Sequence, residues 1–139
     1  LPKNWNAQQT MYRISPRNPK SNWSNANKER ADMLFKAGRM KPSGLRAVEL
    51  AKENGAWNNL DDVEKLIVPP DLEASFKKYE KAACYFKRFP RSSKRGILEW
   101  IKNAKQDTTR QKRIEETAKK ASQNMKANHP TGRDAGPKE

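Results

Sequence analysis

The chain has 139 residues, of which 34 % are hydrophobic and 33 % are charged, and its formal net charge is +14. This length fits one modest domain, and the share of apolar residues is too high for a wholly disordered chain. A single cysteine, Cys84, excludes an intramolecular disulfide, and no apolar run approaches the length of a transmembrane helix. The basic excess favours a polyanion or an acidic protein face as partner.

The first predicted element is an extended arm over residues 1–24, which is rich in Asn and Pro and has no helical period. Pro16 and Pro19 hold the residues before them in extended conformations. We expect Trp23 to anchor this arm on the domain, because it is the large apolar residue next to the first helix.

Two helices are predicted next, over residues 25–37 and 42–54, and their short joint makes them an antiparallel hairpin. Ser24 or Asn25 can cap the first helix, and Gly38 supplies its left-handed stop. The inward residues are predicted from helical spacing. They are Ala26, Arg30, Met33, Leu34 and Ala37 in the first helix, and Leu45, Val48 and Ala51 in the second.

Three further helices follow a connector over residues 56–68. The third is predicted to begin at the Pro-Pro-Asp of residues 69–71 and to continue to about Phe89, because Pro90 is its first strong breaker. The fourth is predicted over residues 92–105 and the fifth over residues 107–122.

The last two helices have clear caps and apolar stripes. Ser92 or Ser93 is predicted to cap the fourth helix, and Asp107 to cap the fifth, where its charge also suits the helix N-terminus. The residues predicted to face inward are Ile97, Leu98, Ile101 and Ala104, then Arg110, Ile114, Thr117, Ala118 and Ala121. Cys84 and Trp100 are also predicted to be core residues, since both lie in apolar surroundings in the sequence.

Residues 124–139 are polar, contain two Gly and two Pro, and are predicted to form a disordered tail. The predicted fold class is therefore all-α. It consists of a single domain of about five helices over residues 25–123, an extended N-terminal arm and a disordered C-terminal tail.

The sequence offers little catalytic or metal chemistry. The one histidine, His129, lies in the predicted tail, and Cys84 has no second thiolate or imidazole near it in the sequence. The acids Asp61, Asp62 and Glu64 lie together, but in a stretch expected to be an exposed connector. We therefore predict a protein that is not an enzyme and that uses no metal or cofactor.

Basic residues are the candidate binding groups. Arg17 and Arg39 flank the first helix and could clamp an anion; the alternative is that they cap backbone carbonyls or lock the arm. A second set could form a basic ridge across the last two helices. Its members are Arg95, Lys102, Lys105, Arg110, Lys112 and Arg113. The alternatives are a solvated helical surface, and an ion pair of Arg110 with an inward acid such as Glu99.

Two segments carry a family resemblance. They are SPRNPKSNWSNANKERADMLFKAGRM over residues 15–40 and SSKRGILEWIKNAKQDTTRQKRI over residues 92–114. With the blocks between them, they resemble the YdeI/OmpD-associated family, the bacteriocin-protection proteins, over about residues 14–114. The resemblance implies an α-helical domain without known catalytic activity. Relatives usually carry a further upstream block like LCFGWIDG, so it also implies either a short member or a missing upstream domain.

These observations predict a non-enzymatic, stress- or envelope-linked binding protein of the YdeI/OmpD-associated type. The alternative is a small basic nucleic-acid-binding protein that acts through the basic ridge. The expected partner is an unidentified protein or a polyanion, and the oligomeric state is left open. No signal peptide opens the chain, so a cytoplasmic location is expected, although the family name points to the envelope.

Overall fold

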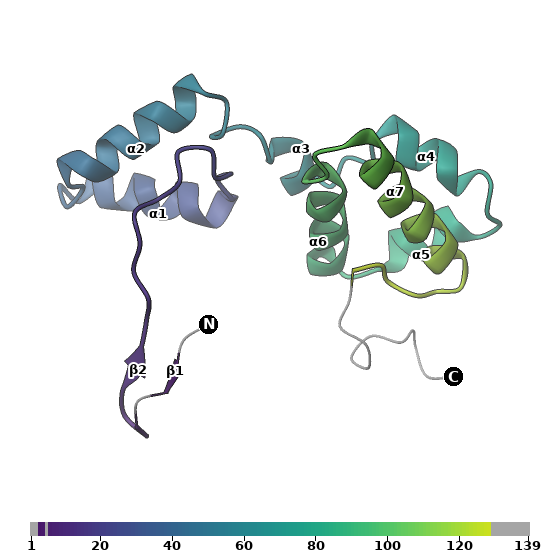
Figure 1. The fold of residues 1–139 in the computed structure, drawn as a ribbon, viewed down its shortest axis with the longest axis horizontal. Helices are drawn as coiled ribbons and strands as arrows, with labels where there is room; N and C mark the ends of the chain where they lie inside the picture. The colour runs from purple at the N-terminus through teal and green to yellow at the C-terminus, as the bar shows by residue number, and fades with distance from the viewer. Residues whose placement is uncertain (1–2, 5, 129–139) are drawn as a thin grey trace. The chain divides into compact units, whose positions relative to one another are not determined.

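The computed structural model describes residues 3–4 and 6–128, and their side chains from Asn6 onward (Figure 1). The described chain is all-α apart from one short β-ribbon, as predicted, but it has seven helices rather than five. In chain order the elements are β1 (Lys3–Asn4), β2 (Thr10–Met11), α1 (Asn25–Lys36), α2 (Pro42–Glu53), α3 (Asp61–Glu64), α4 (Pro70–Phe76), α5 (Ala82–Arg88), α6 (Arg91–Lys102) and α7 (Asp107–Ser122).

These elements form two compact units, residues 1–59 and 60–139, whereas the sequence predicted one domain over residues 25–123. We call them the N-terminal and the C-terminal unit. The division falls in the polar stretch between α2 and α3, where Asn58 and Asn59 are both exposed. Each unit has its own cluster of buried apolar residues.

The N-terminal unit begins with the antiparallel pair β1–β2, in which Lys3 lies opposite Met11. The rest of the predicted arm has no helix or strand up to α1 and is mostly exposed. Ser24 caps α1, as predicted, by accepting a hydrogen bond from the backbone N–H of Asn27 at 3.4 Å. Gly38 follows α1 at φ +67°, a backbone conformation that favours glycine.

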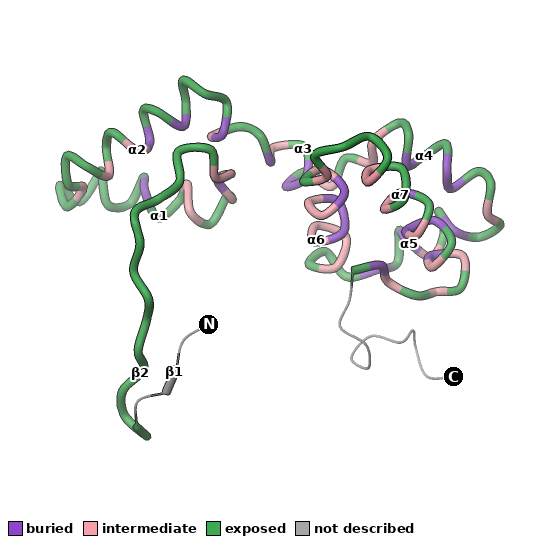
Figure 2. Tube along the Cα trace, viewed as in Figure 1, coloured by how far each residue is buried: buried purple, intermediate pink, exposed green. Residues whose placement is uncertain are grey.

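The core of the N-terminal unit is small. Its buried residues are Trp23, Ala31, Val48, Ala51 and Ala56. Figure 2 shows how little of α1 and α2 is buried. Ala31 is the buried residue of α1, so the prediction that Met33 and Leu34 face inward is wrong. The bulk comes instead from the rings of Trp23 and Trp57, whose centroids lie 5.1 Å apart.

The C-terminal unit is built around α7, which packs against α4, α5 and α6, while α3 packs against α6. Its core is larger and richer in Leu, Ile and Phe than that of the N-terminal unit. The predicted inward faces of the last two helices are confirmed for Ile97, Leu98, Ile101, Ile114, Thr117, Ala118 and Ala121, which are all buried.

The third predicted helix is in fact two helices, α4 and α5. The break lies before α5, where Lys81 has a left-handed backbone at φ +65°. The packing of the core explains this break. The centroids of the Phe76 and Phe86 rings lie 5.1 Å apart. In one straight helix these residues, ten positions apart, would be separated by about 15 Å along the axis. Reversing the chain lets both rings enter one core.

Three predicted local details are also wrong. The connector contains the short helix α3. The N-cap of α6 is Pro90, so Ser92 and Ser93 lie inside its first turn. The N-cap of α7 is Gln106, although Asp107 still places its charge in the first turn.

Two residues predicted to be core lie nearer the surface. Cys84 is exposed, because α5 turns Ala82 and Phe86 inward instead. Trp100 is half-buried at the edge of the core. At the other end, Ala127 is buried, so residues 124–128 of the predicted tail are part of the ordered chain. The rest of the predicted tail, with His129, lies outside the described residues.

We expect Ile101→Ala to lower the free energy of unfolding by about 2–5 kcal/mol, because Ile101 is fully buried and its loss leaves a cavity. Cys84→Ser, at an exposed position, should change it by less than about 0.5 kcal/mol. Denaturant titration followed by circular dichroism measures both. Equal losses in the two variants would place the core of the C-terminal unit elsewhere.

Candidate functional site

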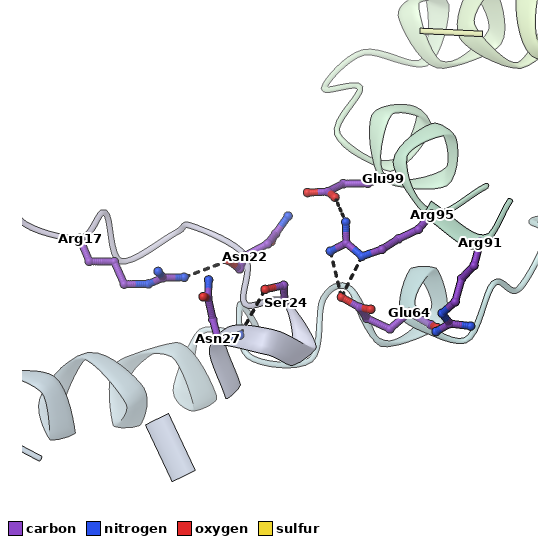
Figure 3. Close-up of polar contacts among 8 residues, drawn as sticks. All are labelled: Arg17, Asn22, Ser24, Asn27, Glu64, Arg91, Arg95 and Glu99. Carbon is purple, nitrogen blue, oxygen red and sulfur yellow. Dashed lines mark hydrogen bonds and ion pairs between the residues drawn. The ribbon is translucent and has the colours of Figure 1, made fainter. Parts of the chain in front are cut away.

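Arg95 joins α6 to α3. Its Nε and Nη2 atoms donate hydrogen bonds to Oε1 of Glu64 at 3.1 and 2.9 Å, and its Nη1 donates to Oε2 of Glu99 at 2.7 Å (Figure 3). The Glu64 side chain is only 10 % exposed. The hydrogen bond that Arg95 donates to Glu64 is the main cause that raises the pKa of Arg95. Arg95 therefore serves to compensate a buried carboxylate.

Arg91 holds the backbone of the same residue. Its Nη2 donates to the carbonyl oxygen of Glu64 at 2.5 Å. Arg91 was not among the predicted site residues. The sequence does contain a pattern that indicates its role. Arg91, Arg95 and Glu99 follow one another at intervals of four and so share a face of α6.

Arg110 joins α7 to α4. Its Nε and Nη2 atoms donate to Oδ2 and Oδ1 of Asp71 at 2.7 and 3.0 Å, which is a bidentate pair. This pairing lowers the pKa of Asp71 and raises that of Arg110. The predicted alternative was an ion pair of Arg110 with an inward acid such as Glu99. Arg110 does form an ion pair, but its partner is Asp71, which is exposed.

Arg113 turns toward α6. It donates a hydrogen bond to the carbonyl oxygen of Trp100, and its guanidinium lies 5.0 Å from the centre of the Trp100 ring. The three ridge arginines therefore contact three different helices: Arg95 contacts α3, Arg110 contacts α4 and Arg113 contacts α6. They hold helices of the C-terminal unit together, and their guanidinium groups do not converge on one binding site.

The three ridge lysines remain as candidate binding groups. Lys102 is half-buried and lines a pocket of about 240 Å³ together with Arg110. Lys105 is exposed in the joint between α6 and α7. Lys112 is exposed on α7 and lines a wider hollow of about 870 Å³ between α4 and α7, which also contains Asp71 and Glu115.

Arg17 locks the arm of the N-terminal unit. Its guanidinium lies 3.9 Å from the centre of the Trp23 ring and donates to the carbonyl oxygens of Asn22 at 2.9 Å and Ser21 at 3.4 Å. This matches the alternative reading of Arg17 as a structural residue. Arg39 is exposed in the loop after α1, and the basic residue that shares a pocket of about 150 Å³ with Arg17 is Arg46.

In the part of the chain that the structure describes, no three His, Cys, Asp or Glu side chains are grouped as metal ligands would be. No described helix is both long and apolar enough to cross a lipid bilayer.

We expect Arg95→Met to be more destabilising than Glu64→Gln. The first variant leaves a buried carboxylate without its main partner and should cost about 2–4 kcal/mol. The second leaves Arg95 paired with Glu99 and should cost about half as much. Glu99→Gln is the control at a more exposed position, with an expected loss under about 1 kcal/mol. The opposite order in urea titration would show that Glu64 does not need Arg95.

The pair of Asp71 and Arg110 should give a pH-dependent coupling. The pKa of Asp71 is lowered in the folded state, so the pair stabilises the fold above the unfolded pKa of about 3.9 and loses this effect as pH falls through the folded value. A double-mutant cycle with Asp71→Asn and Arg110→Met should therefore give a coupling of under about 1 kcal/mol at pH 7, since both side chains are partly exposed. A coupling that grows in acid would contradict this assignment.

Comparison with known families separates the two parts of the chain. Residues 1–47 match the model of a domain of unknown function (DUF8412), so the first of the two resembling segments lies in this match. No curated protein and no solved structure matches the chain. Residues 65–124, which contain α4 to α7, match the model of the family described as Bacteriocin-protection, YdeI or OmpD-Associated. Over this helical part, the chain is thus similar to the YdeI or OmpD-associated family, which is the resemblance that the sequence indicated.

Proposed function

We propose that this chain is a non-enzymatic, stress- or envelope-linked binding protein of the bacteriocin-protection type. In this proposal it recognises an acidic partner through the exposed lysines of its C-terminal unit. The description of the family supports the biological setting. The distribution of charge in the C-terminal unit supports the mode of binding.

The observation that carries the proposal is that several carboxylates of this unit, including the buried Glu64, are engaged inside it. Glu64 and Glu99 bind Arg95, and Asp71 binds Arg110. Glu115 accepts hydrogen bonds from the hydroxyl groups of Tyr79 and Ser75, which raises the pKa of Tyr79. Among the described residues of this unit, exposed lysines outnumber exposed acids, so its surface stays positive.

The exposed positive charge is carried mainly by lysine. Long, hydrated lysine side chains suit contacts with acidic surfaces that do not require a fixed geometry. The lysines of the predicted ridge are Lys105 and Lys112, which are exposed, and Lys102, which is half-buried. Within residues 6–128, their ammonium groups take part in no hydrogen bond or ion pair. We infer that these three form the centre of the partner surface and that attraction between opposite charges dominates the binding.

The test is affinity capture from the native cell with the whole chain as bait, with and without nuclease. A triple variant, Lys102→Ala, Lys105→Ala and Lys112→Ala, is compared with a matched control, Lys65→Ala, Lys77→Ala and Lys87→Ala, which removes the same charge at other exposed positions. We expect one acidic protein to be retained by the parent and the control, to survive nuclease, and to be lost from the triple variant. Equal retention by all three proteins would exclude this surface.

Nucleic-acid binding is the second candidate, favoured by the position of the three lysines at the end of α6 and the beginning of α7. Because the ridge arginines are engaged within the fold, at most about three phosphate contacts remain. The affinity for random duplex DNA should then fall with salt with a log–log slope no steeper than about −2.7. Fluorescence anisotropy measures it. A steeper slope, or a preference for one sequence, would require contacts beyond these lysines.

A further inference from the structure

The end of the α1–α2 hairpin carries three consecutive apolar side chains that are open to solvent. Met33 is 69 % exposed, Phe35 is 62 % exposed and Leu34 is 42 % exposed. Single exposed apolar residues are ordinary, but these three lie in the last turn of α1, about 100° apart around its axis, and so surround the end of the helix with apolar surface of the kind that marks an interaction site. We call this patch, with Arg39 and Lys41, the hairpin tip.

The way in which α1 ends explains why the patch is uncovered. The backbone N–H groups of Gly38 and Arg39 bond to the carbonyl oxygens of Phe35 and Leu34 at 3.0 and 2.9 Å. This is a Schellman motif, in which the residue after the glycine is frequently apolar and covers the residue at the position of Leu34. Here that residue is Arg39. The motif therefore leaves Leu34 open and places a cation beside it.

The tip is also strongly basic. From Arg30 to Arg46 the chain has five basic residues and one acid. That acid, Asp32, pairs with Lys36 at 2.8 Å. Arg39 and Lys41 are exposed on either side of Met40, whose sulfur packs onto the helix at Gly44. The surroundings of the apolar patch are thus positive.

We propose that the hairpin tip docks on the surface of an anionic lipid bilayer, with Met33 and Phe35 in the headgroup region and Arg39 and Lys41 on lipid phosphates. A protein partner of ordinary affinity buries about 800 Å² on each side, far more than three side chains supply. A duplex would meet the cations but would leave the apolar trio without a counterpart. A bilayer interface accepts a small apolar wedge together with basic residues. This surface belongs to the N-terminal unit and is separate from the proposed lysine surface.

The test is co-sedimentation of the whole chain with vesicles of phosphatidylcholine, either alone or mixed with phosphatidylglycerol. Two double variants probe the tip: Met33→Ser with Phe35→Ser, and Arg39→Gln with Lys41→Gln. Two controls lie in the C-terminal unit: Met125→Ser at an exposed apolar position, and Lys65→Gln with Lys77→Gln for the same loss of charge at exposed positions outside the proposed lysine surface. Circular dichroism checks that each variant keeps the helix content of the parent.

We expect the parent to bind the anionic vesicles and to bind phosphatidylcholine alone much more weakly. Each cation near an anionic surface is worth about 5-fold in affinity, so the Arg39 and Lys41 variant should bind roughly 30-fold more weakly. The Met33 and Phe35 variant should lose more than about 10-fold. Met125→Ser should bind like the parent, and the lysine control should lose clearly less than the tip charge variant.

Three results would overturn the proposal. One is equal loss in the tip charge variant and the lysine control, which would mean adsorption by net charge. The second is a Met33 and Phe35 variant that binds like the parent, which would mean that the apolar residues stay outside the lipid. The third is that the tip variants no longer bind duplex DNA or an acidic protein while their binding to vesicles is unchanged. That result would assign the tip to the other partner.

Discussion

The C-terminal unit depends on one buried carboxylate. Glu64 lies on α3, a helix of four residues that is too short to be stable alone. It persists because Arg95 binds its side chain and Arg91 binds its backbone, both from α6. By fixing α3, this contact also directs Leu60 and Val63 into the core. A charge that would be costly to bury by itself thus sets the position of the first element of the unit.

The same logic divides the basic residues into two classes. Arginine occupies the positions where a planar, forked donor must reach a fixed acceptor, as at Arg95, Arg110 and Arg113. Lysine occupies many of the exposed positions, as at Lys105 and Lys112. Net charge alone conceals this division, since it counts both residues equally. Much of the arginine charge stabilises the fold, so the surface available to partners is smaller than +14 suggests.

The helices with strong local signals could be predicted from the sequence. Ser24, Gly38 and Pro42 mark the ends of α1 and α2 closely, and the apolar spacing of α6 and α7 identifies their buried faces. These features depend on residues within a turn or two of one another. The inward face of α1 was predicted wrongly, because it depends on Trp23 and Trp57, which lie outside the helix.

What the sequence left open depends on contacts between distant residues. The break between α4 and α5 has no Pro or Gly to announce it and follows from packing Phe76 against Phe86. Of the predicted site, the list of basic residues was a sound starting point, but their roles could not be separated. Arg110 and Asp71 are 39 positions apart, and no local pattern links them.

The division of the chain between Asn59 and Leu60 has a consequence for how this protein can evolve. The two family matches end at residue 47 and begin at residue 65, so the structural boundary lies in the interval between them. Each buried cluster is made from residues on one side of that boundary. Recombination there would exchange a whole unit and leave the other core intact. A boundary of this kind would tolerate exchange of the N-terminal half as a module, because neither buried cluster would lose a residue.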